Sequence, residues 1–501
     1  MRPKHPLYTI LLIGAALLTG CSAQPPKEFT ETNHVATMHP DYSAITIPYN
    51  IAPLNFAYTM EGENFITELK SGDHTLTTKG KQTNWNIKKW HQFLEACKGK
   101  TIEVITYAQT DKGWTKYLPT TWTVPNASID PYISYRIIAP SYVTYEELSI
   151  RQRDLTNFDE QIIYNNMLLS TDTDGQCINC HSYKNYKTDN MQFHARQHKG
   201  GTVLVTNGEV KKINLKTDST ISAGVYPAWH PTHNLIAYSV NDTGQSFHTR
   251  NNNKIEVQDL KSDLILYDID HNEVSIIEND TLEWEVFPAW APDGKTLYYS
   301  SAHFEVQNHS GREREIIDRY RDFHYNIYRK TFDPDTQTFG PREMVLNADS
   351  LGKSATLPRI SPDGRYLLFG MADYGCFHIW HKDADLYTID LKTMKLRNMQ
   401  EINSHDVESY HSWSSNGRWI LFTSRRDDGG YTRLYIAYFD EGGKAHKPFI
   451  LPQEAPHFYE DYYKSYNVPE FMHEPVTITP QEFARHIDND AIQAKFRGTN
   501  H

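Results

Sequence analysis

The chain has 501 residues, which is too long for one ordinary domain core and predicts two or three domains. Charged residues make up 22% and hydrophobic residues 39%, the balance of a globular rather than a disordered chain. The formal net charge of −12 argues against a nucleic-acid partner, because phosphate groups require Lys and Arg surfaces. Aromatic residues reach 13%, which favours β-structure.

Residues 1–21 are predicted to form an export signal and not part of the fold. Arg2 and Lys4 precede an apolar run at 7–18 that is too short to span a bilayer. The run ends in Leu-Thr-Gly-Cys, which resembles the lipobox of bacterial lipoproteins. The resemblance implies a lipidated Cys21 and a membrane anchor, and we expect the outer membrane, facing the periplasm. A plain signal peptide or a signal anchor is the alternative.

Residues 28–140 contain short stretches rich in Thr, Ile, Tyr and Val, which are typical of strands. We expect a small β-sandwich of immunoglobulin-like size. Ile87, Trp90, Leu94 and Cys97 recur at steps of three and four, which predicts one helix. Cys97 lies on the apolar face of that helix, so a buried thiol is expected there rather than a disulfide.

Residues 141–200 are predicted to be a short connector between two folded parts. A capping box from Thr144 to Glu147 predicts a helix start near Tyr145. The tail at 476–501 is predicted to hold a short helix that begins after Thr479, with proline at its first position. The stretch at 312–321, dense in Arg and Glu, predicts a solvated helix.

From about residue 200 the chain repeats one pattern, in which a Pro/Trp-rich stretch and a turn precede an apolar strand. A Pro-Asp-Gly or Asn-Gly turn between apolar runs is a strong hairpin signal, because glycine supplies the positive φ of the turn. The pattern occurs at 226–239, 287–300, 357–369 and 410–424.

Each unit predicts about four strands, as in a β-propeller blade. The units resemble the TolB-like propeller repeat, which implies a mainly β fold with a propeller of five or six blades at 201–475. Residues 202–215 and 466–471 could together form one composite blade that closes the ring.

Cys177-Ile178-Asn179-Cys180-His181 is the sharpest chemical signal in the chain. Two thiols three positions apart can bond both vinyl groups of one porphyrin, and the next residue supplies an imidazole to the iron. The motif matches the cytochrome c attachment site at Cys177, Cys180 and His181, so we expect one covalent haem c. A structural disulfide, a redox dithiol and half of a zinc site are the alternatives.

The second axial ligand is expected downstream of the motif. The chain is similar to exported TolB-like proteins in which a CxxCH-bearing connector is followed by Phe-His-x-Arg and Gly-Gly, as at 193–196 and 200–201 here. The resemblance favours His194 as the ligand, ahead of Met191 and His198. Arg196 could pair with a haem propionate, because its planar fork suits carboxylates.

Loops rich in His, Trp, Arg and Asp at a propeller mouth can bind ligands or partners. His381, Asp383, His411 and Arg426 are the candidates for such a site, and inter-blade packing or decorated turns are the alternative. No G-x-S-x-G, P-loop, Rossmann or H-E-x-x-H motif occurs, so we expect no catalytic residues.

The predicted function is therefore that of a lipid-anchored monohaem electron-transfer protein, whose propeller docks an envelope protein or redox partner. The alternative is a TolB-like periplasmic scaffold that binds proteins or glycans and whose CxxC forms a structural disulfide. The sequence identifies no small-molecule substrate.

Overall fold

The computed structural model describes residues 24–139, 147–171, 173–248, 253, 255–307 and 311–500. The predicted lipidation site Cys21 and the predicted helix start at Tyr145 lie outside these residues. None of the described helices is long and apolar enough to cross a membrane.

An N-terminal domain of short strands and one helix occupies residues 30–124, in agreement with the predicted β-rich unit. Its helix α1 (Ile87–Ala96) buries Trp90, Phe93 and Leu94, and the Asn86 side chain caps its first turn. A seven-stranded sheet and a separate two-stranded pair contain β1 (Thr30–Val35), β2 (Met38–His39), β3 (Ile45–Thr46), β4 (Ala57–Tyr58), β5 (Asn64–Ser71), β6 (His74–Lys79), β7 (Lys100–Thr110), β8 (Gly113–Leu118) and β9 (Thr120–Val124).

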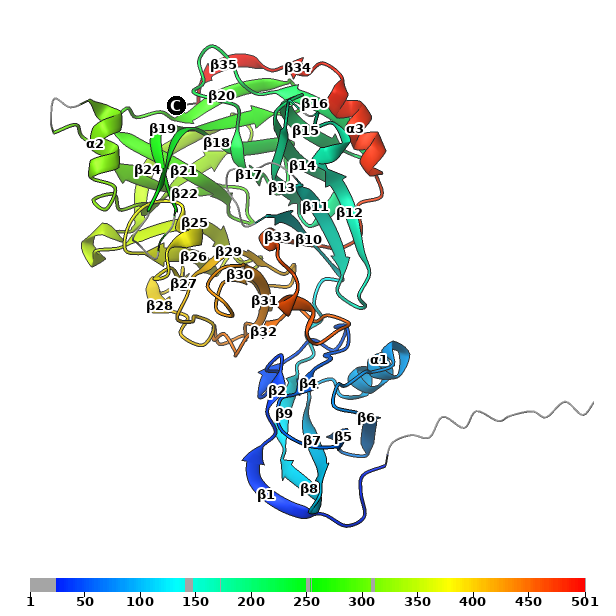
Figure 1. Cartoon of the computed structure of the whole chain (residues 1–501). Helices are drawn as coiled ribbons and strands as arrows, with labels where there is room; N and C mark the ends of the chain where they lie inside the picture. The colour runs from blue at the N-terminus through cyan, green and yellow to red at the C-terminus, as the bar shows by residue number, and fades with distance from the viewer. Residues whose placement is uncertain are drawn as a thin grey trace, which may run out of the picture.

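The described part of the remaining chain forms six four-stranded blades, which confirms the predicted propeller (Figure 1). Blade 1 contains β33 (Ser465–Met472), β10 (Tyr132–Ile138), β11 (Ser149–Asp154) and β12 (Glu160–Asn165). Blade 2 contains β13 (Gln176–Lys184), β14 (Lys187–Gln197), β15 (Gly201–Thr206) and β16 (Glu209–Asn214). Blade 3 contains β17 (Val225–Trp229), β18 (Leu235–Phe247), β19 (Ile255–Asp268) and β20 (Glu273–Glu278).

The last three blades follow in chain order. Blade 4 contains β21 (Glu283–Trp290), β22 (Thr296–His303), β23 (Asn326–Asp333) and β24 (Thr338–Leu346), with the predicted helix α2 (Arg312–Asp318) inserted between β22 and β23. Blade 5 contains β25 (Ser354–Ile360), β26 (Tyr366–Ala372), β27 (Asp385–Asp390) and β28 (Lys395–Asn398). Blade 6 contains β29 (Glu408–Trp413), β30 (Trp419–Ser424), β31 (Arg433–Tyr438) and β32 (Phe449–Ile450).

The ring closes in blade 1, where β33 from the end of the chain pairs with β10 (Figure 1). The segment 141–200, predicted as a connector, instead supplies β11 and β12 to blade 1 and β13 and β14 to blade 2. A composite blade does exist, but the partner of 466–471 is 132–165 and not 202–215. Strands in blades 1 and 2 are favoured over a connector, because they pair backbone N–H and C=O groups of 132–197 that a connector would leave to solvent.

The C-terminal tail covers two blade edges. The predicted helix is α3 (Pro480–Asp488), capped by Thr479. After it, β34 (Ile492–Gln493) adds in parallel to β16 and β35 (Lys495–Thr499) adds in parallel to β20. The tail therefore satisfies backbone groups at the outer edges of blades 2 and 3, where exposed edges would invite association with other chains.

The N-terminal domain packs against blade 6 (Figure 1). One hydrophobic cluster contains residues of both. The carboxylate of Asp130 accepts hydrogen bonds from the Ser415 amide (2.7 Å) and hydroxyl. The Trp419 indole donates to the Ser128 carbonyl at 3.0 Å. The two domains thus form a continuous interface, which places residues 38–41 beside the last blade.

Glu285 on β21 is buried between blades without a partner. Its side chain is fully buried, and neither carboxylate oxygen has a hydrogen bond within the described part of the chain. Burial, with the nearby charges of Glu278, Asp263 and Glu283, raises the pKa of Glu285 to about 9. The carboxyl is therefore protonated at neutral pH, because an unpaired buried charge is too costly.

We predict that Glu285→Gln stabilises the protein at alkaline pH. Because the pKa is raised in the fold, native Glu285 keeps a proton that the unfolded chain loses above about pH 4.5, and stability falls as pH rises toward 9. The amide removes this loss, so the free energy of unfolding, measured by urea denaturation, should rise at pH 8 by on the order of a few kcal/mol and stay unchanged at pH 4. The exposed Glu474→Gln is the control, and equal effects of the two variants would contradict the prediction.

Candidate functional site: the channel and the interdomain cleft

The innermost strand of every blade carries the same two-residue β-bulge. The first bulge residue has a left-handed φ between 39° and 56°, an outlier for side chains other than glycine and asparagine. The six residues are Cys180, Tyr226, Phe287, Leu357, Tyr410 and Val468. Each bulge stands opposite one buried aromatic residue of the next strand: Phe193, Tyr238, Tyr299, Phe369, Phe422 and Tyr135.

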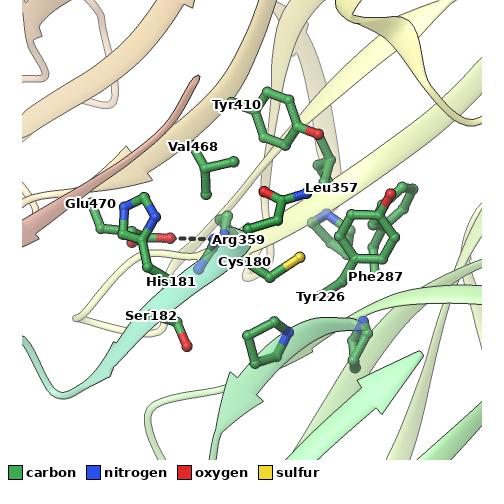
Figure 2. A pocket seen from close by; sticks show the side chains of 14 residues that line it. Cys180, His181, Ser182, Tyr226, Phe287, Leu357, Arg359, Tyr410, Val468 and Glu470 are labelled. Carbon is green, nitrogen blue, oxygen red and sulfur yellow. Dashed lines mark hydrogen bonds and ion pairs between the residues drawn. The ribbon is translucent and has the colours of Figure 1, made fainter. Parts of the chain in front are cut away.

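The six bulges line a narrow channel on the propeller axis (Figure 2). The cavity there is about 50 Å³, room for a few water molecules. Arg359 and Glu470 face each other across it, with an N–O distance of 2.6 Å. The charges inside the channel therefore compensate one another, and the aromatic and aliphatic bulge residues fill most of the remaining space.

Two residues of the CxxCH motif form the bulge of blade 2. Cys180-His181 on β13 corresponds to Tyr226-Pro227, Phe287-Pro288, Leu357-Pro358, Tyr410-His411 and Val468-Pro469 in the other blades. The sequence Asn-Cys-His-Ser-Tyr at 179–183 parallels Ser-Tyr-His-Ser-Trp at 409–413, a signal that sequence reasoning missed. The position of Cys180 and His181 thus follows from the blade repeat itself.

The two cysteines of the motif form no disulfide and differ in their surroundings. Cys177 and Cys180 are free thiols, so the alternative of a structural disulfide is wrong. Cys97 and Cys376 are likewise unbridged and buried. Burial raises the pKa of the Cys180 thiol. The Arg136 guanidinium lies 3.8 Å from the Cys177 sulfur.

His181 is almost fully buried beside Ser134 of β10, and neither ring nitrogen makes a hydrogen bond of normal geometry to a described residue. Burial lowers its pKa to about 3, so the ring is neutral.

The structure does not bring the predicted axial ligands together. The ring centroid of His194 on β14 lies 5.8 Å from that of Tyr238 of blade 3. Its Nδ1 lies 3.0 Å from the hydroxyl of Thr202 on the neighbouring strand of blade 2. Met191 is fully buried in an apolar cluster shared with blade 1. Arg196 is exposed and opposite Cys177 in the strand register.

The CxxCH residues have the donor groups of a haem site but not the space for one. The donors suit one, because the thiols are free and the His181 imidazole is neutral and unpartnered in the described chain. The channel cavity does not suit one, because its volume of about 50 Å³ is about a third of a cavity of about 150 Å³ that holds a single benzene, and a porphyrin is several times larger than benzene. Figure 2 shows the Cys180 sulfur directed toward Tyr226, while the His181 ring lies beside Glu470. As placed here, these residues do not fit an attached porphyrin.

The predicted propeller-mouth residues also lie apart. His381 is buried 2.9 Å from the Glu256 carboxylate, and Asp383 accepts a hydrogen bond from the Asp373 amide. His411 donates to the Leu357 carbonyl in the channel wall. Arg426 alone of the four borders a large cavity.

That cavity is a cleft of about 690 Å³ between the N-terminal domain and blade 6. Ligand sites commonly have this size and commonly lie between domains. Its lining comes from three distant parts of the chain: His39, Pro40 and Asp41; Ser404, His405, Arg426, Asp427, Asp428, Arg433 and Tyr435; and Lys447, Pro448, Phe449, Ile450, Tyr459 and Glu460. The stretch that contains Arg426, Asp427 and Asp428 is a predicted ligand loop, whereas sequence reasoning missed the other residues because no local motif joins them.

No protein-family model and no curated protein matches the chain. Solved structures similar to it include an oligogalacturonate lyase in complex with manganese, at 15% identity and a TM-score of 0.31, covering 68% of this chain and 86% of that one. Prolyl oligopeptidase B from Galerina marginata, bound to a macrocyclization substrate, shows 9% identity and a TM-score of 0.36, covering 69% of this chain and 42% of its own. The β-propeller domain of the trilobed protease from Pyrococcus furiosus shows 11% identity and a TM-score of 0.29, covering 83% of this chain and 98% of that one.

We predict that His181→Pro is tolerated, although proline inside a strand usually removes a ladder hydrogen bond and destabilises the sheet. Four of the other five blades carry proline at this position, after a residue with the same left-handed φ. The free energy of unfolding, measured by urea denaturation, should change by no more than about 1 kcal/mol. The neighbouring Ser182→Pro, outside the bulge, should destabilise strongly. Equal losses for the two variants would mean that residue 181 is not a repeat position.

Proposed function

We propose that this chain is a binding protein that holds a neutral, hydroxyl-rich ligand such as an oligosaccharide in the cleft between its N-terminal domain and blade 6. The observation that carries the proposal is the size of this cleft, about 690 Å³, against about 50 Å³ in the channel. Ligand pockets of a few hundred Å³ bury most of a small molecule's surface.

The lining of the cleft supports a ligand without net charge. Its charged groups are already paired: Arg426 with Glu408 at 2.9 Å, and Lys447 with Asp41 at 2.8 Å. The Asp427 carboxylate accepts a hydrogen bond from the Tyr435 hydroxyl at 2.6 Å. An ionic ligand would have to displace these partners, whereas hydroxyl groups can add to them. Tyr435, Phe449 and Tyr459 supply aromatic surface beside the polar groups.

We expect the purified chain to bind neutral oligosaccharides in preference to acidic ones, and His405→Trp to weaken binding at least tenfold. His405 is exposed at the cleft, so the larger ring narrows the site without disturbing the core. A glycan array followed by titration calorimetry measures this, with Lys392→Trp on an exposed turn of blade 5 as the matched control. Absence of binding across the array, or equal affinity of both variants, would exclude the proposal.

A second candidate is the one-electron transfer predicted from the CxxCH motif, and the unpartnered ring nitrogens of His181 favour it. A haem, when bound, would supply the redox chemistry. Because the channel cavity beside His181 is about 50 Å³, attachment of a porphyrin there would require a rearrangement of the strands around it. Anchoring through Cys21 at the outer membrane, and docking of an envelope or redox partner, belong to the same proposal.

Intact mass and visible absorption of the chain, made in a host with lipoprotein and haem-attachment systems, test this candidate. The binding proposal expects a colourless protein. A Soret band that survives denaturation and is lost in Cys177→Ser plus Cys180→Ser would establish the haem. The mass of the same sample reports whether Cys21 carries lipid.

A further inference from the structure

Two histidines and one glutamate meet at the rim of the interdomain cleft. The His457 Nδ1 lies 2.7 Å from a Glu460 carboxylate oxygen, and the His39 Nε2 lies 3.6 Å from the same oxygen. The two imidazole rings stack with centroids 5.7 Å apart and an angle of 18°. One donor atom from each residue lies within 4.8 Å of the other two. In the described part of the chain, this is the one group of three such residues gathered closely enough for a metal ion.

The fold holds these side chains from both domains. His39 belongs to β2, which pairs with β4 of the N-terminal domain. His457 and Glu460 lie at the short helix η4 (Phe458–Glu460), in the loop between blade 6 and β33.

Arg433 of β31 organises this loop. Its guanidinium is almost fully buried and donates to the carbonyls of Tyr459, Tyr462 and Lys464. It also lies over the rings of Tyr459 and Tyr462, 5.2 and 5.8 Å from their centroids. A buried cation therefore fixes the backbone that carries two of the three donors.

We infer that His39, His457 and Glu460 form a binding site for a divalent transition metal of the zinc class. Two imidazoles and one carboxylate are donors that zinc prefers, whereas calcium and magnesium prefer oxygen ligands alone. A metal would replace the imidazole–carboxylate contacts with coordinate bonds and would join the N-terminal domain to the loop before β33.

Three protein donors leave a fourth tetrahedral position open. Glu460 and His39 also line the cleft of about 690 Å³, so a metal held by them would lie at the edge of the volume proposed for the ligand. Metal binding does not depend on that ligand, and it can be measured with the metal alone. The two proposals can therefore fail separately.

Calorimetric titration of chelator-treated full-length protein with Zn²⁺ tests the inference. The titration uses a Cys177→Ser, Cys180→Ser background, so that thiols contribute no binding. We expect one site that His39→Ala and His457→Ala each weaken at least tenfold, while His405→Ala, a histidine of the same cleft outside the group, stays within twofold. Co²⁺ should give the visible absorption of a tetrahedral site in the background chain and in His405→Ala.

The substituted histidines are more than two-fifths exposed, so the variants should fold, and circular dichroism checks this. Absence of a Zn²⁺ site in the background chain would overturn the inference. A site of unchanged affinity in folded His39→Ala and His457→Ala would also overturn it, and would show that other histidines bind the metal.

Discussion

The structure depends on the pairing of β33 with β10, which joins strands more than three hundred residues apart in the chain. Six register pairs, from Tyr132↔Met472 to Ile138↔Ser465, close the ring of blades. Closing so long a loop carries an entropic cost, but the cost grows only slowly with length, and the buried strand pairs and the hydrophobic cluster around them offset it. The same strand carries Val468 and Glu470 into the channel, and the loop before it carries Glu460 to the cleft.

Much of the propeller could be predicted from sequence, because the start of each of blades 3 to 6 repeats one local sequence pattern. Pro-Asp-Gly and Asn-Gly turns follow Trp290, Ile360 and Trp413, and apolar strands come next. Blade 3 lacks such a turn but keeps the Pro-Ala-Trp stretch at 227–229 and the apolar strand at 235–239. Blades 1 and 2 have no such turn after their innermost strands, and the Asn207-Gly208 turn of blade 2 joins its two outer strands. The link between β13 and β14 runs through Asn185 and Tyr186, which both adopt left-handed φ without glycine. The strands β11 to β14 were therefore assigned to a connector, and β10 to the N-terminal domain.

The meaning of Cys180 and His181 depended on that assignment. In a connector, the backbone of a CxxCH motif is not held in a sheet and can place both thiols and the imidazole around a porphyrin. On the innermost strand of a blade, the same residues occupy a bulge that five other blades repeat, and the ring of bulges leaves a cavity of about 50 Å³. The cleft and the His39, His457, Glu460 group could not be predicted, because they arise only when the N-terminal domain packs on blade 6.

The central claim is that 465–472 is an integral strand of blade 1, and hydrogen–deuterium exchange of the full-length protein tests it most directly. The amides of β33 that pair with β10 should exchange as slowly as those of β29 and β30, because ring opening requires global unfolding. Fast exchange of 465–472, with β29 and β30 still protected, would show that the ring is not closed by this strand. The channel and the cleft described here would then lose their basis.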